Sequence, residues 1–223
     1  MAWNVDQLYG FLRFLLRKNQ SGSVSATEFF YAWNSEQLAY FMDLKGRFQA
    51  RSNGKSGANT GLIENETIET KLSPFTKNDT ITITSGDGPK PSDFSYLLAL
   101  RINGKAVLHI NKNQIATVND NVIDPPLISE DCYYYTPYLN KYTFFPSTVT
   151  EAEIDYIATP TDVVWGYTIV SGRQVYSSGA SVQPQWMQED ILEITKRTLD
   201  SFGVSYHDND FTQYGKSVIN TGN

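Results

Sequence analysis

The spacing of apolar residues changes twice along this chain of 223 residues, and this change constrains its fold more than any single motif. Apolar residues recur at helical spacing up to residue 72, alternate with polar residues from residue 80, and return to helical spacing after residue 184. A helix buries one side of a 3.6-residue period and a strand buries every second residue, so this order predicts helices, then strands, then one helix. We expect an α+β fold with N-terminal helices, a central, mostly antiparallel β-sandwich or open barrel, and a C-terminal helix with an extended tail. These four parts have the expected boundaries 1–76, 77–180, 181–204 and 205–223.

The N-terminal region carries the patterns of several helices. Residues 4–18 place apolar side chains at helical spacing. Ser25 and Glu28 have the spacing of a capping box and open an apolar segment that runs to Phe48. Because Asn34-Ser35 are better caps than interior residues, that segment forms either one helix or two. A further short helix is expected over 62–72.

The middle of the chain has the pattern of short strands. Asn103-Gly104 separates two apolar runs, and this dipeptide is the strongest short-range signal for a hairpin. A polar helical turn is expected over 112–119. The expected strands are 80–84, 95–102, 105–110, 133–136, 141–145, 153–157, 163–170 and 174–177.

The most complete set of helix signals lies near the end of the chain. Pro184 suits a first helical position, where its missing N–H is not needed. Glu189 and Asp190 lie early and Lys196 and Arg197 lie late, which matches the helix dipole. We therefore predict a helix from residue 184 to residue 203. Its apolar stripe consists of Met187, Ile191, Ile194, Thr198 and Phe202.

Composition argues against several classes of protein. The single Cys132 excludes an internal disulfide and is interpreted as a small apolar residue in a strand. The sequence lacks a run of the roughly 20 apolar residues that a membrane span requires, so we expect no membrane partner. With a net charge of -6, the chain is not expected to grip nucleic acid by neutralising phosphates, although it can still surround it.

One short motif and two histidines invite a catalytic interpretation that the sequence does not sustain. Gly54-Lys55-Ser56 resembles the end of a phosphate-binding loop, but Gln49 occupies the position of the required first glycine. His109 and His207 are the two histidines, and His109 is expected to be a partly buried residue of a hairpin strand.

Three acidic residues share one face of an expected strand. Glu151, Glu153 and Asp155 offer paired carboxylates of the kind that cleave glycosides, yet the same alternation is typical of any half-exposed strand. We predict no catalytic residue, no cofactor and no metal site. A chain of this size without such chemistry is more often a binding or structural component than an enzyme.

Three stretches together resemble one known family. They are Thr27-Glu28-Phe29-Phe30 with Trp33-Asn34 and Leu72-Ser73-Pro74-Phe75, then Ile154-Asp155-Tyr156 with Thr159-Pro160 and Val163-Val164-Trp165, and finally Trp186 to Gly203 with Asp208 and Tyr214. In these stretches the chain resembles the virion structural proteins of crAss-like bacteriophages, in particular the ring proteins of the neck and tail.

The resemblance implies a non-enzymatic subunit of a homo-oligomeric ring, a dodecamer matching the portal, through which genomic DNA leaves the capsid. It implies the portal or adjoining neck and tail rings as partners, and transient contact with packaged DNA. It also implies a location in the neck or tail of the virion, after assembly in the cytoplasm of the host bacterium.

A ring subunit needs two unlike patches that repeat around an axis, and aromatic strands and terminal segments are the candidates. The segment from Ser205 onward is expected to be ordered only against a partner. The candidate interface residues are Trp186, Phe202, Val204, Tyr206, Phe211, Tyr214, Tyr134 and Tyr138. The alternative is a β-rich adhesion or carbohydrate-binding module of a phage tail, with Tyr134 and Tyr138 as a platform for sugars.

Overall fold

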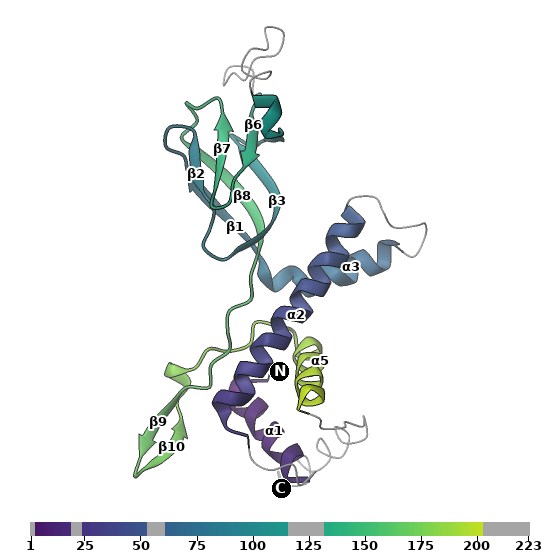
Figure 1. The fold of residues 1–223 in the computed structure, drawn as a ribbon, viewed down its shortest axis with the longest axis vertical. Helices are drawn as coiled ribbons and strands as arrows, with labels where there is room; N and C mark the ends of the chain where they lie inside the picture. Colours follow the sequence, from purple (N-terminus) through teal and green to yellow (C-terminus); the bar gives the residue numbers. More distant parts are fainter. Residues whose placement is uncertain (1–2, 19–23, 53–60, 116–131, 203–223) are drawn as a thin grey trace. The chain divides into compact units, whose positions relative to one another are not determined.

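The structure is a computed structural model that describes residues 3–18, 24–52, 61–115 and 132–202. These residues form the α+β fold that the sequence predicts, with helices near both ends of the chain (Figure 1). The chain divides into two compact units. The β unit is Phe75–Thr159, and the helical unit combines Met1–Pro74 with Pro160–Asn223. The helical unit is therefore built from two segments that are distant in sequence.

The β unit is built from two sheets. Among the described residues, one sheet has the strand order β1-β8-β3-β4 and the other has the order β2-β7-β6-β5. Neighbouring strands are antiparallel except for β5 and β6, which are parallel. The strands are β1 (Thr76–Thr82), β2 (Asp87–Pro89), β3 (Phe94–Ile102), β4 (Lys105–Ala106), β5 (Leu108–His109), β6 (Tyr134–Pro137), β7 (Lys141–Phe145) and β8 (Glu151–Ala158).

Both sheets contribute side chains to one buried cluster, which is the core of the β unit. Ile81 and Ile154 come from the first sheet, and Tyr142 and Phe144 come from the second. Gly88 of β2 lies so close to β1 that a Cβ atom there would be 2.6 Å from Ile81 Cγ2. Two sheets that share one core fit the predicted β-sandwich or open barrel, and Thr84 and Asp87 form an antiparallel bridge between the segment after β1 and the start of β2.

The predicted hairpin at Asn103-Gly104 is present, with φ of 52° and 75° at these two residues. The single strand expected over 105–110 is wrong, because the chain changes sheets within it. Val107 N–H donates to Leu100 O at 3.0 Å in the first sheet, whereas Leu108 N–H donates to Tyr133 O at 2.9 Å in the second. His109 on β5 is exposed and not partly buried as expected.

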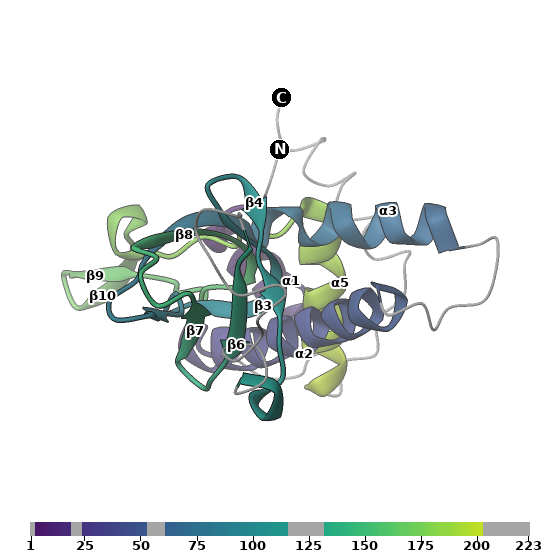
Figure 2. The same cartoon turned by 90° about the horizontal axis from the view of Figure 1, so that it is seen from above.

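The helical unit contains four helices among the described residues. The capping box at the start of the longest helix is confirmed: Glu28 N–H donates to Ser25 Oγ at 3.2 Å, and Ser25 N–H donates to Glu28 Oε2 at 3.0 Å. The helices are α1 (Val5–Lys18), α2 (Ala26–Ser52), α3 (Gly61–Leu72) and α5 (Gln188–Ser201). Figure 2 shows α1, α2 and α5 from a second direction.

Helix α2 is continuous through Asn34 and Ser35, so the two-helix alternative is wrong. An asparagine breaks a helix when its side chain competes for the helix's own backbone. Here the Asn34 side chain forms hydrogen bonds with the backbone of Val163, which lies 129 residues away in sequence. The helix therefore continues past a residue pair with a preference for caps.

Helix α5 begins at Gln188, four residues after the predicted start at Pro184. Met187 precedes it with an extended backbone at φ −65° and ψ 157°. Trp186 is buried, and its indole N–H donates to Gln37 Oε1 at 3.2 Å. The burial of this tryptophan in an extended segment prevails over the local preference of proline for a first helical turn.

The predicted stripe of α5 is correct in its centre and wrong at its ends. Ile191, Ile194 and Thr198 are buried, whereas Met187 and Phe202 are 41% and 37% exposed. The last described residue is Phe202, so the predicted tail 205–223 lies outside the described residues.

The predicted β body also differs from the compact unit. Strands β9 (Tyr167–Val170) and β10 (Arg173–Tyr176) fall within the expected range 77–180, yet they belong to the helical unit. The strand predicted over 163–170 begins only at Tyr167, because Val163 is hydrogen-bonded to Asn34 of helix α2 and Val164 forms an isolated antiparallel bridge with Val182.

Candidate functional site

Strands β9 and β10 form a hairpin that projects from the helices of its unit (Figure 1 and Figure 2). Val170 pairs with Arg173 and Tyr167 pairs with Tyr176, which leaves a two-residue turn. The turn residues Ser171 and Gly172 have φ of 52° and 75°. Positive φ at both positions defines a type I′ turn, whose twist matches that of the two strands.

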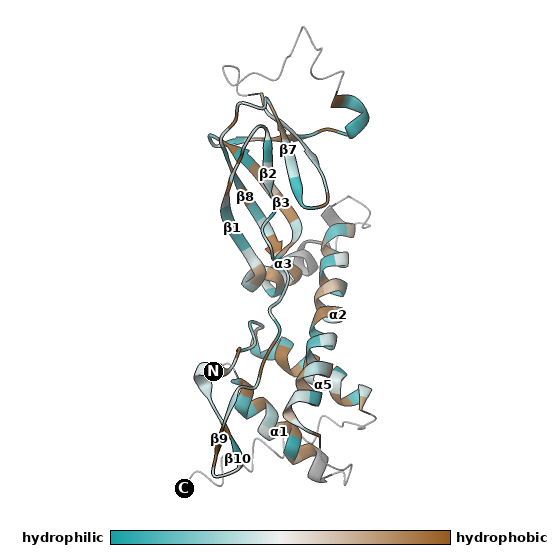
Figure 3. Cartoon of the chain, turned by 60° about the vertical axis from the view of Figure 1, so that its left-hand side comes forward, coloured by the Kyte–Doolittle hydropathy of each residue, from teal (hydrophilic) through white to brown (hydrophobic). Residues whose placement is uncertain are grey.

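This hairpin exposes apolar side chains on both faces. Alternation and cross-strand pairing place Ile169 and Tyr167 on one face, and Val170 and Val175 on the other. Ile169 is 71% exposed and Val170 is 54% exposed, and Figure 3 colours the strand as hydrophobic. Among the described residues no third strand joins this two-stranded sheet. An isolated hairpin with uncovered apolar faces is only marginally stable in water, so it favours contact with another surface.

The base of the hairpin is fixed to α1 by an aromatic cluster around Trp165. The Trp165 ring centroid lies 5.3 Å from that of Tyr9, 5.8 Å from Tyr167 and 6.1 Å from Tyr176. Its indole N–H donates to Asp6 Oδ1 at 3.0 Å. The aromatic contacts cover the base only, so the hairpin is held at one end and presented at the other.

A close backbone crossing supports the same base. A Cβ atom on Gly166 would lie 2.2 Å from both the carbonyl carbon and the carbonyl oxygen of Ala180. Gly166 N–H donates to Ser181 Oγ at 2.9 Å, and Ser177 N–H donates to Gly166 O at 2.9 Å. Only glycine permits this approach, so the direction in which the hairpin leaves the unit depends on Gly166.

Helix α2 holds the segment that leads into the hairpin. Asn34 Nδ2 donates to Val163 O at 3.0 Å, and Val163 N–H donates to Asn34 Oδ1 at 2.8 Å. Gln37 Nε2 donates to Thr161 O at 3.1 Å. Side-chain amides thus satisfy backbone groups that a neighbouring strand would otherwise pair.

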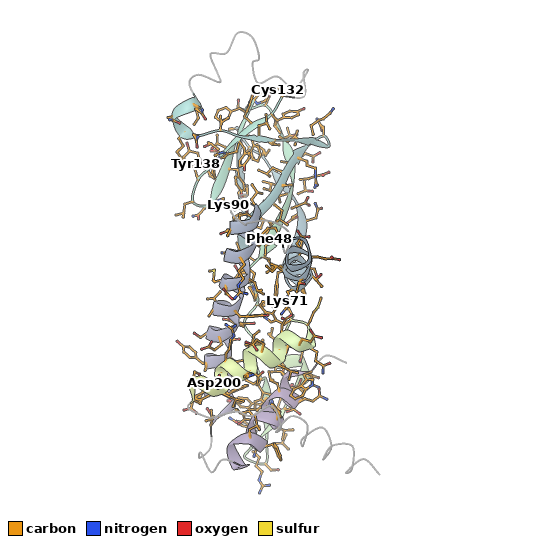
Figure 4. All side chains as sticks on the ribbon, turned by 90° about the vertical axis from the view of Figure 1, so that its right-hand side faces the viewer. Phe48, Lys71, Lys90, Cys132, Tyr138 and Asp200 are labelled. Atoms are coloured by element: carbon orange, nitrogen blue, oxygen red, sulfur yellow. The ribbon has the colours of Figure 1, made fainter. Side chains whose placement is uncertain are left out.

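A second polar cluster joins α2, α3 and α5. The Tyr40 hydroxyl donates to Asp190 Oδ1 at 2.7 Å, and Lys71 Nζ lies 2.9 Å from both of these oxygens (Lys71 is labelled in Figure 4). Asp190 is buried. Burial alone would lower the pKa of Lys71, but its hydrogen bonds to Tyr40 and Asp190 and the charge of Asp190 raise it above its usual value. Burial is also the main cause that raises the pKa of Tyr40. The cluster locks the three helices together.

Beside this cluster is a groove of about 540 Å³ between α2, α3 and α5. Its cations already form ion pairs: Arg47 with Asp43 at 2.8 Å, and Arg197 with Glu193 at 3.0 Å. Among the described residues no group of three His, Cys, Asp or Glu side chains is arranged to hold a metal ion. The groove therefore lies where three helices pack together, and its arginines are already paired with carboxylates of the same unit.

On the acidic face of β8, Asp155 is held by contacts with the two neighbouring strands. Asp155 accepts a hydrogen bond from Asn78 Nδ2 at 2.6 Å and forms an ion pair with Arg101. Glu151 and Glu153 are exposed on the same face. Asp155 therefore ties β8 to its two neighbours, β1 and β3.

The structure separates the predicted interface residues. Trp186 is 3% exposed and belongs to the core of the helical unit, so it offers no surface to a partner. Phe202 is partly exposed in the helical unit, whereas Tyr134 and Tyr138 belong to the β unit. The other predicted interface residues, Val204, Tyr206, Phe211 and Tyr214, lie outside the described residues.

The two tyrosines of the β unit already have neighbours. Tyr134 is half-buried, and its hydroxyl accepts a hydrogen bond from Cys132 Sγ at 3.3 Å. Lys112 Nζ lies 4.1 Å from the centroid of the Tyr138 ring and Lys141 Nζ lies 5.7 Å from it (Tyr138 is labelled in Figure 4). These lysines occupy ring surface that a sugar would stack on.

The comparisons with known proteins found no family model that matches the chain and no curated protein that matches it. Within the described part of the chain, no helix has the length and apolar character needed to cross a membrane.

The exposed hairpin is the feature that the sequence analysis missed. It predicted strands at 163–170 and 174–177 but assigned them to the β body, where their apolar residues would be buried. The available signal was Ser171-Gly172, a dipeptide suited to a two-residue turn, between strands whose apolar residues are adjacent instead of alternating.

Proposed function

We propose that this protein is a non-enzymatic structural subunit of a tailed-phage virion that forms a ring in the head-to-tail connector. The observation that carries the proposal is the β9–β10 hairpin, which projects from its unit with Ile169, Val170 and Val175 exposed. The resemblance of the sequence to neck and tail ring proteins of crAss-like phages supports the same role.

A ring requires a heterologous interface, in which a patch on one subunit binds a different patch on the next. A projecting hairpin suits this geometry because it extends beyond its own unit while its base is fixed by Trp165 and Gly166. Apolar residues at its outer half supply the dry centre that protein interfaces need. The helical unit, held together by the Tyr40–Asp190–Lys71 cluster, is a rigid base for such an element.

The charge of the chain is compatible with a DNA conduit. A net charge of -6 favours weak repulsion between the subunit and DNA, so that DNA would slide along the ring without being held. We infer that the protein occurs in the neck or tail of the virion, beside the portal or an adjoining ring, after assembly in the cytoplasm of the host bacterium. A dodecamer matches the portal symmetry that the resemblance implies.

The alternative of a β-rich adhesion or carbohydrate-binding module is less well supported. It needs exposed aromatic faces, and the face of Tyr138 is approached by Lys112 and Lys141. Glycan-array binding by the wild type that is abolished by Tyr138→Ala would favour the module over the ring.

Electron microscopy of the purified full-length chain tests the proposal directly. Closed rings with a central opening, and the binding of such rings to portal-containing capsids, are the expected result. Particles of single-chain size at all concentrations, with no binding to capsids, would contradict it.

A further inference from the structure

Helix α2 has a second apolar stripe that faces away from its packed side. Tyr31, Ser35, Leu38 and Met42 follow one another at intervals of four, three and four residues, so they lie on one face of the helix. Tyr31 is 82% exposed, Leu38 is 42% exposed and Met42 is 48% exposed. We call these four residues the α2 stripe.

The opposite face of α2 is already covered within the helical unit. Phe29, Trp33 and Phe41 are fully buried there, and Trp33 Nε1 donates to Thr195 Oγ1 of α5 at 3.2 Å. A helix that is apolar on both sides is typical of one buried on both sides. The α2 stripe is the side that the described residues leave open to solvent.

Small residues flank the stripe and leave room beside it. Ala39 and Gly46 are exposed, and a Cβ atom on Gly46 would meet nothing within 4 Å. Large apolar side chains next to small ones form ridges and gaps that accept an incoming apolar element.

The hairpin and the stripe match in length. Four residues of a strand extend roughly 13 Å, and the eleven-residue rise from Tyr31 to Met42 extends roughly 17 Å along a helix axis. The face of the hairpin that carries Val170 and Val175 therefore fits within the α2 stripe.

The two elements also complement each other in charge. From residue 163 to residue 188 the only charged residue is Arg173, which is exposed next to the hairpin turn. Helix α2 carries Glu28 and Glu36 beside the first part of the α2 stripe, whereas its basic residues, Lys45, Arg47 and Arg51, all follow Met42, and Arg47 pairs with Asp43. A basic hairpin tip is therefore attracted to the end of the stripe that lies near Glu28 and Glu36, which favours one orientation of the apolar contact.

We propose that the β9–β10 hairpin of one copy docks on the α2 stripe of the next copy, an inference that rests on the proposed ring function and names its interface. The two patches are unlike, so the contact repeats head to tail. Apolar contact of Val170 and Val175, which share one face of the hairpin, with Tyr31, Leu38 and Met42 forms the centre of the interface, where a few residues contribute most of the binding energy.

Disulfide cross-linking tests this pairing, because Cys132 is the single native cysteine. In a Cys132→Ser background, Val170→Cys and Leu38→Cys are prepared as two separate chains and mixed under mild oxidation. The mixture should give a disulfide-linked dimer, and each chain alone should give on the order of tenfold less, as expected for contact between unlike patches. A chain with both substitutions should give a ladder of linked multimers.

A matched control uses Glu69→Cys on α3, an exposed position outside both patches. When mixed with Val170→Cys it should give no disulfide-linked dimer. If Val170→Cys dimerises equally well alone, the hairpins bind each other and the proposal is overturned. If Glu69→Cys links as efficiently as Leu38→Cys, the α2 stripe is not the docking site.

A separate readout distinguishes this inference from the proposed function. If the cysteine-free protein forms closed rings and Val170→Cys does not link to Leu38→Cys, the hairpin pairing is wrong and the ring function stands. If no ring forms at all, both are contradicted.

Val175→Asp and Leu38→Asp, each at an exposed site, should keep the helical circular dichroism of the wild type and weaken association by about tenfold or more.

Discussion

Asn34 in the middle of helix α2 forms a pair of hydrogen bonds with the backbone of Val163. The side-chain amide donates to the carbonyl oxygen at 3.0 Å, and its oxygen accepts from the amide N–H at 2.8 Å. This is the pattern by which one strand binds another, provided here by a single side chain. It fixes the point where the chain re-enters the helical unit and turns toward the hairpin.

Asn34→Ala should therefore destabilise the helical unit. The substitution leaves the N–H and carbonyl of the buried Val163 without their partner, and a buried unsatisfied group costs about 1–3 kcal/mol. We expect a loss of about 2 kcal/mol in the free energy of unfolding by denaturant. Ser35→Ala, on the exposed neighbour, should change it by less than about 0.5 kcal/mol. Equal effects of the two substitutions would refute a special role for Asn34.

Gly166→Ala should displace the hairpin more than it unfolds the protein. An added Cβ would lie 2.2 Å from the Ala180 carbonyl, so the backbone at the hairpin base must shift. Ring assembly should be lost, while hydrogen exchange of α2 and α5 stays slow. Gly179→Ala is the control, because a Cβ atom there meets nothing within 4 Å. Normal assembly of Gly166→Ala would show that the direction of the hairpin is unimportant.

Lys71→Ala should be clearly destabilising, since it removes the cation that faces the buried Asp190. Breaking a buried ion pair costs about 3–5 kcal/mol, and because Tyr40 still donates to Asp190 we expect about 2 kcal/mol. Lys77→Ala removes a partly exposed pair with Asp93 and should cost at most about 1 kcal/mol. Thermal denaturation of both variants gives the comparison, and a smaller effect at Lys71 than at Lys77 would contradict the assigned role.

Because of the raised pKa of Tyr156, we expect the stability of the β unit to depend on pH in the alkaline range. Burial, followed by its hydrogen bond to Asp93, raises the pKa of Tyr156 from 10.0 to about 12. Below pH 10 the hydroxyl is neutral in both the folded and the unfolded state, so stability is unaffected. Between pH 10 and pH 12 the unfolded state loses the proton first, and stability falls as pH rises. Tyr156→Phe should flatten this fall in urea unfolding measured from pH 8 to pH 12. An unchanged slope in the variant would rule out Tyr156 as its source.

Local patterns predicted most elements of the fold. The capping box of Ser25 and Glu28, the turn at Asn103-Gly104 and the strand at 141–145 were predicted correctly. Each depends on residues close in sequence, whose preferences are determined by backbone geometry. The predicted helix start at Pro184 was wrong because Trp186 is buried against Gln37, a contact between residues 149 apart in sequence.

The candidate site was much less predictable. Asn34, Gln37 and Asp190 have polar side chains that a helical pattern assigns to the solvent, yet each binds a group distant in sequence. The exposure of Ile169 could not be predicted from alternation, because alternation indicates a strand and not the unit that the strand joins. Tertiary contacts decide both points.

Native mass spectrometry of the wild type and of Val170→Asp, over a range of protein concentrations, tests the central claim most directly. We expect the wild type to form one closed assembly whose mass is an integer multiple of the 25.2-kDa chain. The variant should keep its helical content and appear mainly as a single chain. A wild type that remains a 25.2-kDa monomer at every concentration, or a variant that assembles as readily as the wild type, would contradict the account.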